Sequence, residues 1–144
     1  METQLLSTDR PIAIYYAFSS EINSYSQTGN SECSVTLSSE WKKIHTSIGK
    51  INIIERQVQT DAGVKYVTEL SAQCPGHDEN TPGDISEVEG RKVLLRCDYR
   101  NGMKKIIGSK VSGPKLFMNI NSSNITNRTL QLTFENTGPN LWLV

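Results

Sequence analysis

The chain lacks most of the features that would assign it to a class at once. It has three cysteines, Cys33, Cys74 and Cys97, and because three cannot all pair within one chain, we do not expect the disulfide framework of a small secreted domain. No run approaches the roughly 18 apolar residues that a membrane-spanning helix needs. Residues 1–7 lack the positive charge and apolar run of a signal peptide. We therefore expect synthesis in the cytoplasm, with reduced thiols and no membrane partner.

Neither sign of charge is in excess. Lys and Arg together number 15, Asp and Glu number 15, and the formal net charge is +0. A chain without a net field is not typical of dedicated nucleic-acid or membrane-surface binders. The apolar share is also low, at 36%, with a mean hydropathy of -0.41. Such a composition suits strands that alternate one buried face with one wet face, and 144 residues fit one domain with a real core.

Alternating apolar and polar residues predict a mainly β fold. Strands are expected at residues 12–18, 33–38, 50–60, 64–73, 91–100, 103–111, 116–120 and 129–134. This many strands between turn signals predicts an antiparallel β-sandwich or small barrel in a single domain over residues 1–144. Thr81, Pro82 and Gly90 can begin and end one short helix within the acidic segment 77–90.

Two turns predict which strands pair with each other. Asp61-Ala62-Gly63 connects strands 50–60 and 64–73, and a glycine at its end predicts a hairpin with a G1-type bulge. Asn101-Gly102 predicts a second hairpin with a type I′ turn, because these residues tolerate the two positive φ angles that the turn needs. The apolar parity slips at Ile54-Glu55, which predicts a bulge or a frayed end there.

Other segments have no such pattern. Residues 19–31 are rich in Ser, Asn and Gly and are expected to form a long loop. Residues 40–47 are too few to decide between helix and strand. The polar segment 1–10 is expected to be a loose or docking arm. The apolar segment 139–144 either binds another subunit or adds an edge strand to its own core, and the sequence leaves both open.

The groups that could carry chemistry do not form a known catalytic or metal-binding pattern. Cys74-Pro75-Gly76-His77 has the spacing of half a zinc site, but a second closely spaced pair is missing. Cys33 and Cys97 lie in strand patterns, where cysteine usually behaves as a small buried hydrophobe. No base or cation is placed to activate a thiol. We therefore expect no catalytic residues, no metal, no cofactor and no enzymatic activity.

Clustered charges have simpler interpretations. The carboxylates of segment 78–89 do not match the spacing of a calcium loop, so a solvated acidic loop is expected. The hairpin at 91–112 is basic, through residues that include Lys104 and Lys105. It can contact phosphates, keep a sheet edge from pairing, or dock on the acidic loop of a neighbouring copy.

Several short segments together resemble one family. They are Ala62-Gly63-Val64-Lys65-Tyr66, Asp98-Tyr99-Arg100-Asn101-Gly102, Lys104-Lys105-Ile106-Ile107-Gly108-Ser109, Pro114-Lys115-Leu116 and Leu130-Gln131-Leu132-Thr133-Phe134. In this order they are similar to small structural proteins encoded in the tail regions of bacteriophages and prophages of Bacteroidetes hosts. The match covers about the last two-thirds of the chain, and Lys115 stands where the pattern usually has leucine. The resemblance implies a non-enzymatic virion protein of the tail or head–tail joint, made in the host cytoplasm and present in several copies.

On this basis the expected partners are other virion proteins and further copies of the chain. The candidate assembly contacts are Lys104, Lys105, Leu141, Trp142, Leu143 and Val144. Trp142 in particular is of the type that dominates interfaces. The alternative is a small ligand- or carbohydrate-binding β domain that uses aromatic rings as stacking surfaces, namely Tyr15, Tyr16, Tyr25, Trp41 and Tyr66.

Overall fold

A computed structural model describes residues 10–44, 46, 50–75, 92–109, 117–120, 127–136 and 138–144. These residues form eleven strands and one short 3₁₀ turn. The elements are β1 (Pro11–Phe18), η1 (Ser19–Glu21), β2 (Ile22–Gln27), β3 (Glu32–Leu37), β4 (Lys42–Ile44), β5 (Ile51–Thr60), β6 (Gly63–Pro75), β7 (Val93–Tyr99), β8 (Lys104–Ile107), β9 (Phe117–Ile120), β10 (Asn127–Asn136) and β11 (Leu141–Leu143). The expected mainly β fold is therefore confirmed. The expected helix within 77–90 and most of the expected arm at 1–10 lie outside the described residues.

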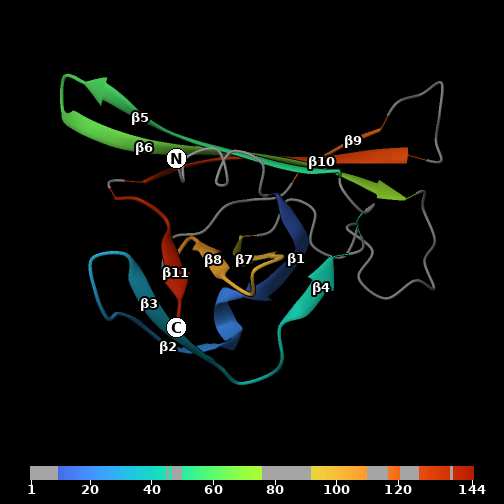
Figure 1. Ribbon diagram of the computed structural model, residues 1–144, viewed down its shortest axis with the longest axis horizontal. Coiled ribbons are helices and arrows are strands. Elements are labelled where there is room, and N and C mark those ends of the chain that lie inside the picture. Colours follow the sequence, from blue (N-terminus) through green and yellow to red (C-terminus); the bar gives the residue numbers. More distant parts are fainter. Residues whose placement is uncertain are drawn as a thin grey trace.

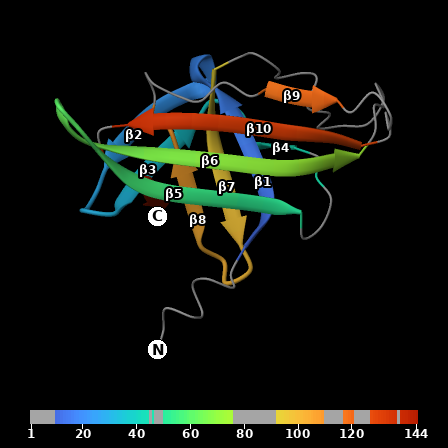
Figure 2. The same cartoon turned by 90° about the horizontal axis from the view of Figure 1, so that it is seen from above.

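The strands form two sheets that face each other as a sandwich. Sheet A has seven strands in the order β2-β3-β11-β8-β7-β1-β4, and sheet B has four in the order β5-β6-β10-β9. Sheet B lies as a layer over sheet A in Figure 1, and its long strands cross those of sheet A in Figure 2. Crossed packing of this kind is one of the two common ways to stack sheets. One pair departs from the antiparallel expectation, since β11 runs parallel to β3.

The main core lies between the sheets. Register places Ile53, Leu70 and Leu132 side by side on the inner face of sheet B. Sheet A contributes alternate residues of β1 and β7, such as Ile14 and Leu95, both fully buried. This is the outcome of period-2 alternation in the sequence, which puts each strand's apolar set on one face. Burying about ten such side chains, at roughly 1.5–3 kcal/mol each, is what holds the two sheets together.

A second core lies on the other face of sheet A. It consists of the buried residues Ile22, Cys33, Leu94, Ile106 and Leu141, with partly buried hydrophobic residues of β2, β3 and β11 packed against them. Figure 1 shows β2 and β3 on one side of this face and β4 on the other. Sheet A therefore curls around the second core. The curl explains why Leu94 and Leu95, neighbours that point to opposite faces, are both buried.

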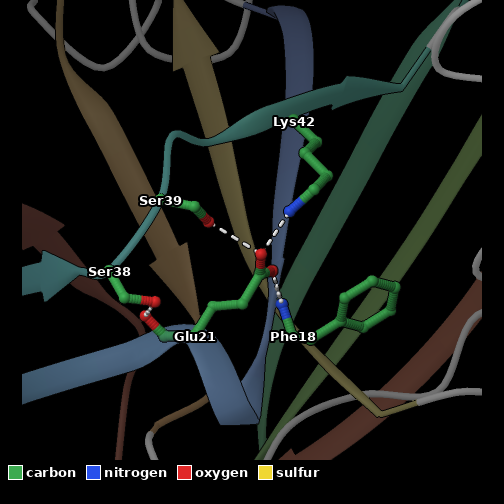
Figure 3. A network of polar contacts seen from close by, with 5 residues as sticks. All are labelled: Phe18, Glu21, Ser38, Ser39 and Lys42. Carbon is green, nitrogen blue, oxygen red and sulfur yellow. Dashed lines mark hydrogen bonds and ion pairs between the residues drawn. The ribbon is translucent and has the colours of Figure 1, made fainter.

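A polar cluster joins the two sides of the curl. Glu21 of η1 accepts hydrogen bonds from Phe18 N (2.9 Å), Ser39 Oγ (2.7 Å) and Lys42 Nζ (2.5 Å), as Figure 3 shows. Ser38 Oγ donates to the Glu21 carbonyl oxygen. Burial acts to raise the pKa of Glu21, but the hydrogen bonds from Lys42, Phe18 and Ser39 outweigh it and lower the pKa from 4.5 to about 2. The folded state therefore favours the ionised carboxylate.

We expect Glu21→Gln to lower the free energy of unfolding at pH 7 by about 1–2 kcal/mol, after allowance for the partly exposed Lys42. Because the folded pKa lies below 4.5, the contribution is present above pH 4.5 and is lost as the pH falls towards 2. Urea unfolding at pH 7 and pH 3 measures it, and the difference between wild type and variant should shrink at pH 3. Glu32→Gln, at an exposed residue of β3, is the control; a difference that stays constant with pH would contradict the prediction.

Two segments differ from the sequence-based expectation. Residues 19–31 were expected to be a loop, yet they contain η1 and the edge strand β2. Only Ile22 of β2 is buried, so the strand is held mainly by backbone pairing with β3. Its sequence has almost none of the apolar alternation that predicts a strand. Within the undecided segment 40–47, the structure forms the three-residue strand β4.

Both expected hairpins form, and both turns differ in detail. Thr60 pairs with Gly63, which has the expected positive φ (118°), but two residues rather than three connect the strands and no register shift marks a bulge. The type I′ turn at Asn101-Gly102 is wrong, because of these two residues only Gly102 has a positive φ (89°). Asn101 Oδ1 instead accepts a hydrogen bond from Met103 N (3.0 Å). This hydrogen bond, from the backbone two residues on to the asparagine side chain, holds a three-residue loop at 100–102.

Candidate functional site

Strand β5 changes character halfway along its inner face. Its pairing with β6 runs without a break from Ile51 to Thr60, so the bulge expected at Ile54-Glu55 is wrong. Glu55 takes the next inward position after Ile51 and Ile53, and Ile54 points outwards with 57% of its surface exposed. The slip in apolar parity therefore marks the point where an apolar inner face gives way to a polar one.

Glu55 is the centre of a polar junction between the sheets. Its Oε1 accepts a hydrogen bond and ion pair from Lys105 Nζ of sheet A at 2.5 Å. Its Oε2 accepts from Asn140 Nδ2 at 2.9 Å, and Asn140 Nδ2 also donates to the buried Thr68 Oγ1 at 2.7 Å. Charge-assisted hydrogen bonds of this kind are about twice as strong as neutral ones. The junction thus joins the two sheets through Lys105 and Glu55 and fixes the segment before β11 against sheet B.

Two aromatic rings shield the ammonium group of this junction. Lys105 Nζ lies 4.5 Å from the centroid of the Trp142 ring and 5.9 Å from that of Tyr99. The rings meet edge to face, with centroids 5.5 Å apart. Only 13% of the Lys105 side chain is exposed. Partial desolvation strengthens both the cation–π contacts and the ion pair with Glu55.

A groove opens beside the junction. It has a volume of about 280 Å³ and lies between the β5–β6 hairpin and the segment that leads into β11. It is lined by Glu55, Arg56, Gln57, Tyr66, Val67, Thr68, Pro139 and Asn140. Gln57 and Tyr66 stand opposite each other in the register, and Gln57 Nε2 donates to Tyr66 Oη at 2.9 Å. The groove therefore combines one aromatic side chain with amide, hydroxyl and carboxylate groups.

Most of the residues expected to make assembly contacts instead make contacts within the chain. Leu141, Trp142 and Leu143 form β11, which lies inside sheet A between β3 and β8. Of the alternatives left open for the terminal segment, the structure places it in the chain's own core, as an interior strand rather than an edge strand. Lys105 belongs to the polar junction. Lys104 is partly exposed, and Val144 is 66% exposed.

Other charged and aromatic residues that the sequence suggested for binding also make contacts within the chain. Arg96 of the basic hairpin makes two hydrogen bonds to Asp98, at 2.7 and 2.9 Å. Its guanidinium lies 4.0 Å from the Tyr15 ring centroid and 5.4 Å from that of Trp41. Tyr16 is buried in the main core. Of the five aromatic residues proposed as stacking surfaces, Tyr66 alone lines the groove.

The three cysteines are buried and form no disulfide bond. Burial raises the pKa of Cys97 to about 12, so this thiol stays protonated at neutral pH. Burial also raises the pKa of Cys33. Within the described residues no group of three His, Cys, Asp or Glu side chains is placed to hold a metal ion. His77 of the Cys74–His77 spacing lies outside the described residues.

The fold and the junction define a class but no known family. The class is a crossed β-sandwich whose two sheets are joined by a Lys–Glu ion pair with a largely buried lysine. Comparison with family models, with characterised proteins and with solved structures gave no match. No helix in the described part of the chain is long and apolar enough to cross a membrane. The sequence carried one weak signal for the junction, the slip in apolar parity at Ile54-Glu55.

Proposed function

We propose that this chain is a non-enzymatic structural component of a bacteriophage virion, in the tail or the head–tail connector. It acts through contacts with copies of itself and with other virion proteins. The observation that supports this most is the outer part of the β5–β6 hairpin, residues 57–66, which we call the arm. Figure 1 shows its tip reaching beyond the strands of sheet A at one end of the molecule.

The arm buries little surface in its own domain. Its strands are fully paired with each other up to Thr60 and Gly63, yet no residue from 57 to 66 is buried. Val64 is 47% exposed. An isolated two-stranded hairpin is marginally stable in water, and ordering costs about 1–2 kcal/mol per residue. A projecting hairpin with an exposed valine is suited to gain that stability from a neighbouring subunit.

The resemblance to phage tail-region proteins points the same way, and its first segment, residues 62–66, falls in the arm. The terminal strand β11 is paired on both sides within the chain, so it is not open to another subunit. Since Leu141 to Leu143 complete the chain's own sheet, the arm replaces the terminal segment as the expected assembly surface. The protein would then be made in the host cytoplasm and carried in the virion.

We expect the protein to form oligomers whose size grows with concentration, and Val64→Asp to weaken them about 30-fold, because a hot-spot contact contributes about 2 kcal/mol. Multi-angle light scattering over a wide range of protein concentration measures this. Thr36→Asp, which places the same charge on an exposed residue of β3, should leave the oligomers unchanged. Thermal unfolding of both variants separates weaker association from misfolding.

A protein that stays monomeric at every concentration and binds no other virion component would contradict the proposed function. If it forms oligomers that Val64→Asp leaves intact, assembly stands but the arm is not its contact surface. The genes beside its own give an independent test, since capsid, portal and tail genes are expected there.

A further inference from the structure

We propose that the groove beside the polar junction binds a neutral saccharide of one or two pyranose rings. This goes beyond the assembly role and does not depend on it. The groove wall formed by Gln57, Tyr66 and Asn140 carries the inference.

The unused polar atoms of the groove suit neighbouring hydroxyl groups. Tyr66 Oη accepts from Gln57 Nε2, so its hydroxyl hydrogen can still be donated. Among the described residues, Gln57 Oε1 and Asn140 Oδ1 have no hydrogen-bond donor. Sugar hydroxyls both donate and accept, and a wall that offers one donor beside two amide acceptors can bind two of them at once. The Tyr66 ring adds an apolar face against which a pyranose can pack.

The charges of the groove are already paired, and this favours a neutral ligand. The Glu55 carboxylate is neutralised by Lys105, and Arg56 forms an ion pair with Glu69 on the outer face of sheet B. A phosphate or carboxylate ligand would have to compete with Glu69 for Arg56, and a cationic ligand with Lys105 for Glu55. A ligand that recognises amides and hydroxyls meets neither cost.

The groove is formed before any ligand binds. Asn140 is held by two hydrogen bonds, to Glu55 and to Thr68, and Thr68 is 3% exposed. Glu55 is held in turn by Lys105, which lies against the Trp142 ring. The Asn140 side of the groove therefore loses little entropy on binding. The groove volume of about 280 Å³ lies just below the usual range of ligand pockets, about 300–1,000 Å³, which suits a ligand of one or two sugar rings and no more.

The test uses the full chain and four probes, the methyl glycosides of glucose, galactose, mannose and N-acetylglucosamine. Amide chemical shifts are followed by NMR during titration with each. We expect at least one glycoside to shift residues 55–57, 66–68 and 139–140 with a millimolar Kd. Gln57→Ala and Tyr66→Phe should each weaken binding about tenfold, the loss expected when one hydrogen bond of about 1.4 kcal/mol is removed.

Gln59→Ala is the matched control, because Gln59 is the next inward residue of β5 and does not line the groove. It should leave the Kd unchanged. Absence of shifts at the groove with all four glycosides would overturn the proposal, as would binding that Gln57→Ala and Tyr66→Phe leave intact. Tighter binding of glucose 6-phosphate than of methyl glucoside would overturn the neutral class. Gln57, Gln59 and Tyr66 also belong to the arm, so light scattering of the same variants measures assembly separately: loss of glycoside binding with unchanged oligomers, or the reverse, distinguishes failure of one proposal from failure of the other.

Discussion

Deletion of residues 141–144 is expected to unfold the domain. Strand β11 lies between β3 and β8, so its loss divides sheet A and leaves each of these two strands without one of its two neighbours. Trp142 N donates to Ser31 O (2.8 Å) and Val144 N to Cys33 O (3.0 Å). The buried Leu141 leaves the second core, and Trp142 leaves the polar junction. Together these losses approach the 5–15 kcal/mol that stabilises a typical domain.

Near-ultraviolet circular dichroism and urea unfolding measure this effect. The truncated chain should show no cooperative transition. Because truncation alone cannot separate causes, two single variants accompany it. Leu141→Ala should cost about 2–4 kcal/mol, as for other large-to-small core changes, whereas Val144→Ala, at a side chain that is 66% exposed, should cost less than about 0.5 kcal/mol. A truncated chain that keeps its melting temperature and loses only association would contradict this placement of the segment.

Removal of the ammonium group at the polar junction is the second large effect. Lys105→Met keeps most of the aliphatic stem and removes the charge, and it should lower the free energy of unfolding by about 2–4 kcal/mol. The physical reason is that Glu55 keeps a charge whose partner has gone, and Trp142 loses its cation–π contact. Glu55→Gln should cost less, because an amide can still accept a hydrogen bond from Lys105.

A double-mutant cycle isolates the pair itself. Between Lys105→Met and Glu55→Gln we expect a coupling energy of about 1–2 kcal/mol, measured by urea unfolding. The exposed pair Lys65–Glu135, with Nζ and Oε1 3.1 Å apart, is the matched control. Lys65→Met with Glu135→Gln should give a coupling below about 0.5 kcal/mol, since solvent screens that pair. Equal coupling in the two cycles would mean that desolvation by Trp142 and Tyr99 adds nothing.

Whether an element could be predicted from the sequence depended on whether its signal was local in the chain. The β5–β6 hairpin was predicted because both strands alternate and a glycine ends the turn, which are local properties. The turn at 100–102 was predicted in place but not in type. Asn101 can either adopt a positive φ or bond its own backbone, and the local sequence does not choose between these. Strand β2 was missed because an edge strand with one buried residue resembles a loop in composition.

The candidate site was harder to predict from the sequence than the fold. Its members come from β5, β6, β8 and the segment before β11, which are far apart in the chain, and no local pattern links them. The break in alternation at Glu55 was the one signal, and a charged residue in an apolar position is explained as well by a bulge as by a distant partner. Lys105 was noted for its charge, but its neighbours Trp142 and Glu55 could not be foreseen.

The sequence by itself determined that the chain is mainly β, where most of its strands lie and which side chains face inwards, because strand periodicity and turn chemistry act between residues close in the chain. Only the tertiary structure decided that the last strand completes sheet A from inside, that sheet A encloses a second core, and that Lys105, Glu55 and Asn140 meet. These depend on pairing between distant segments, where many registers satisfy the same alternation and only the packed whole selects one.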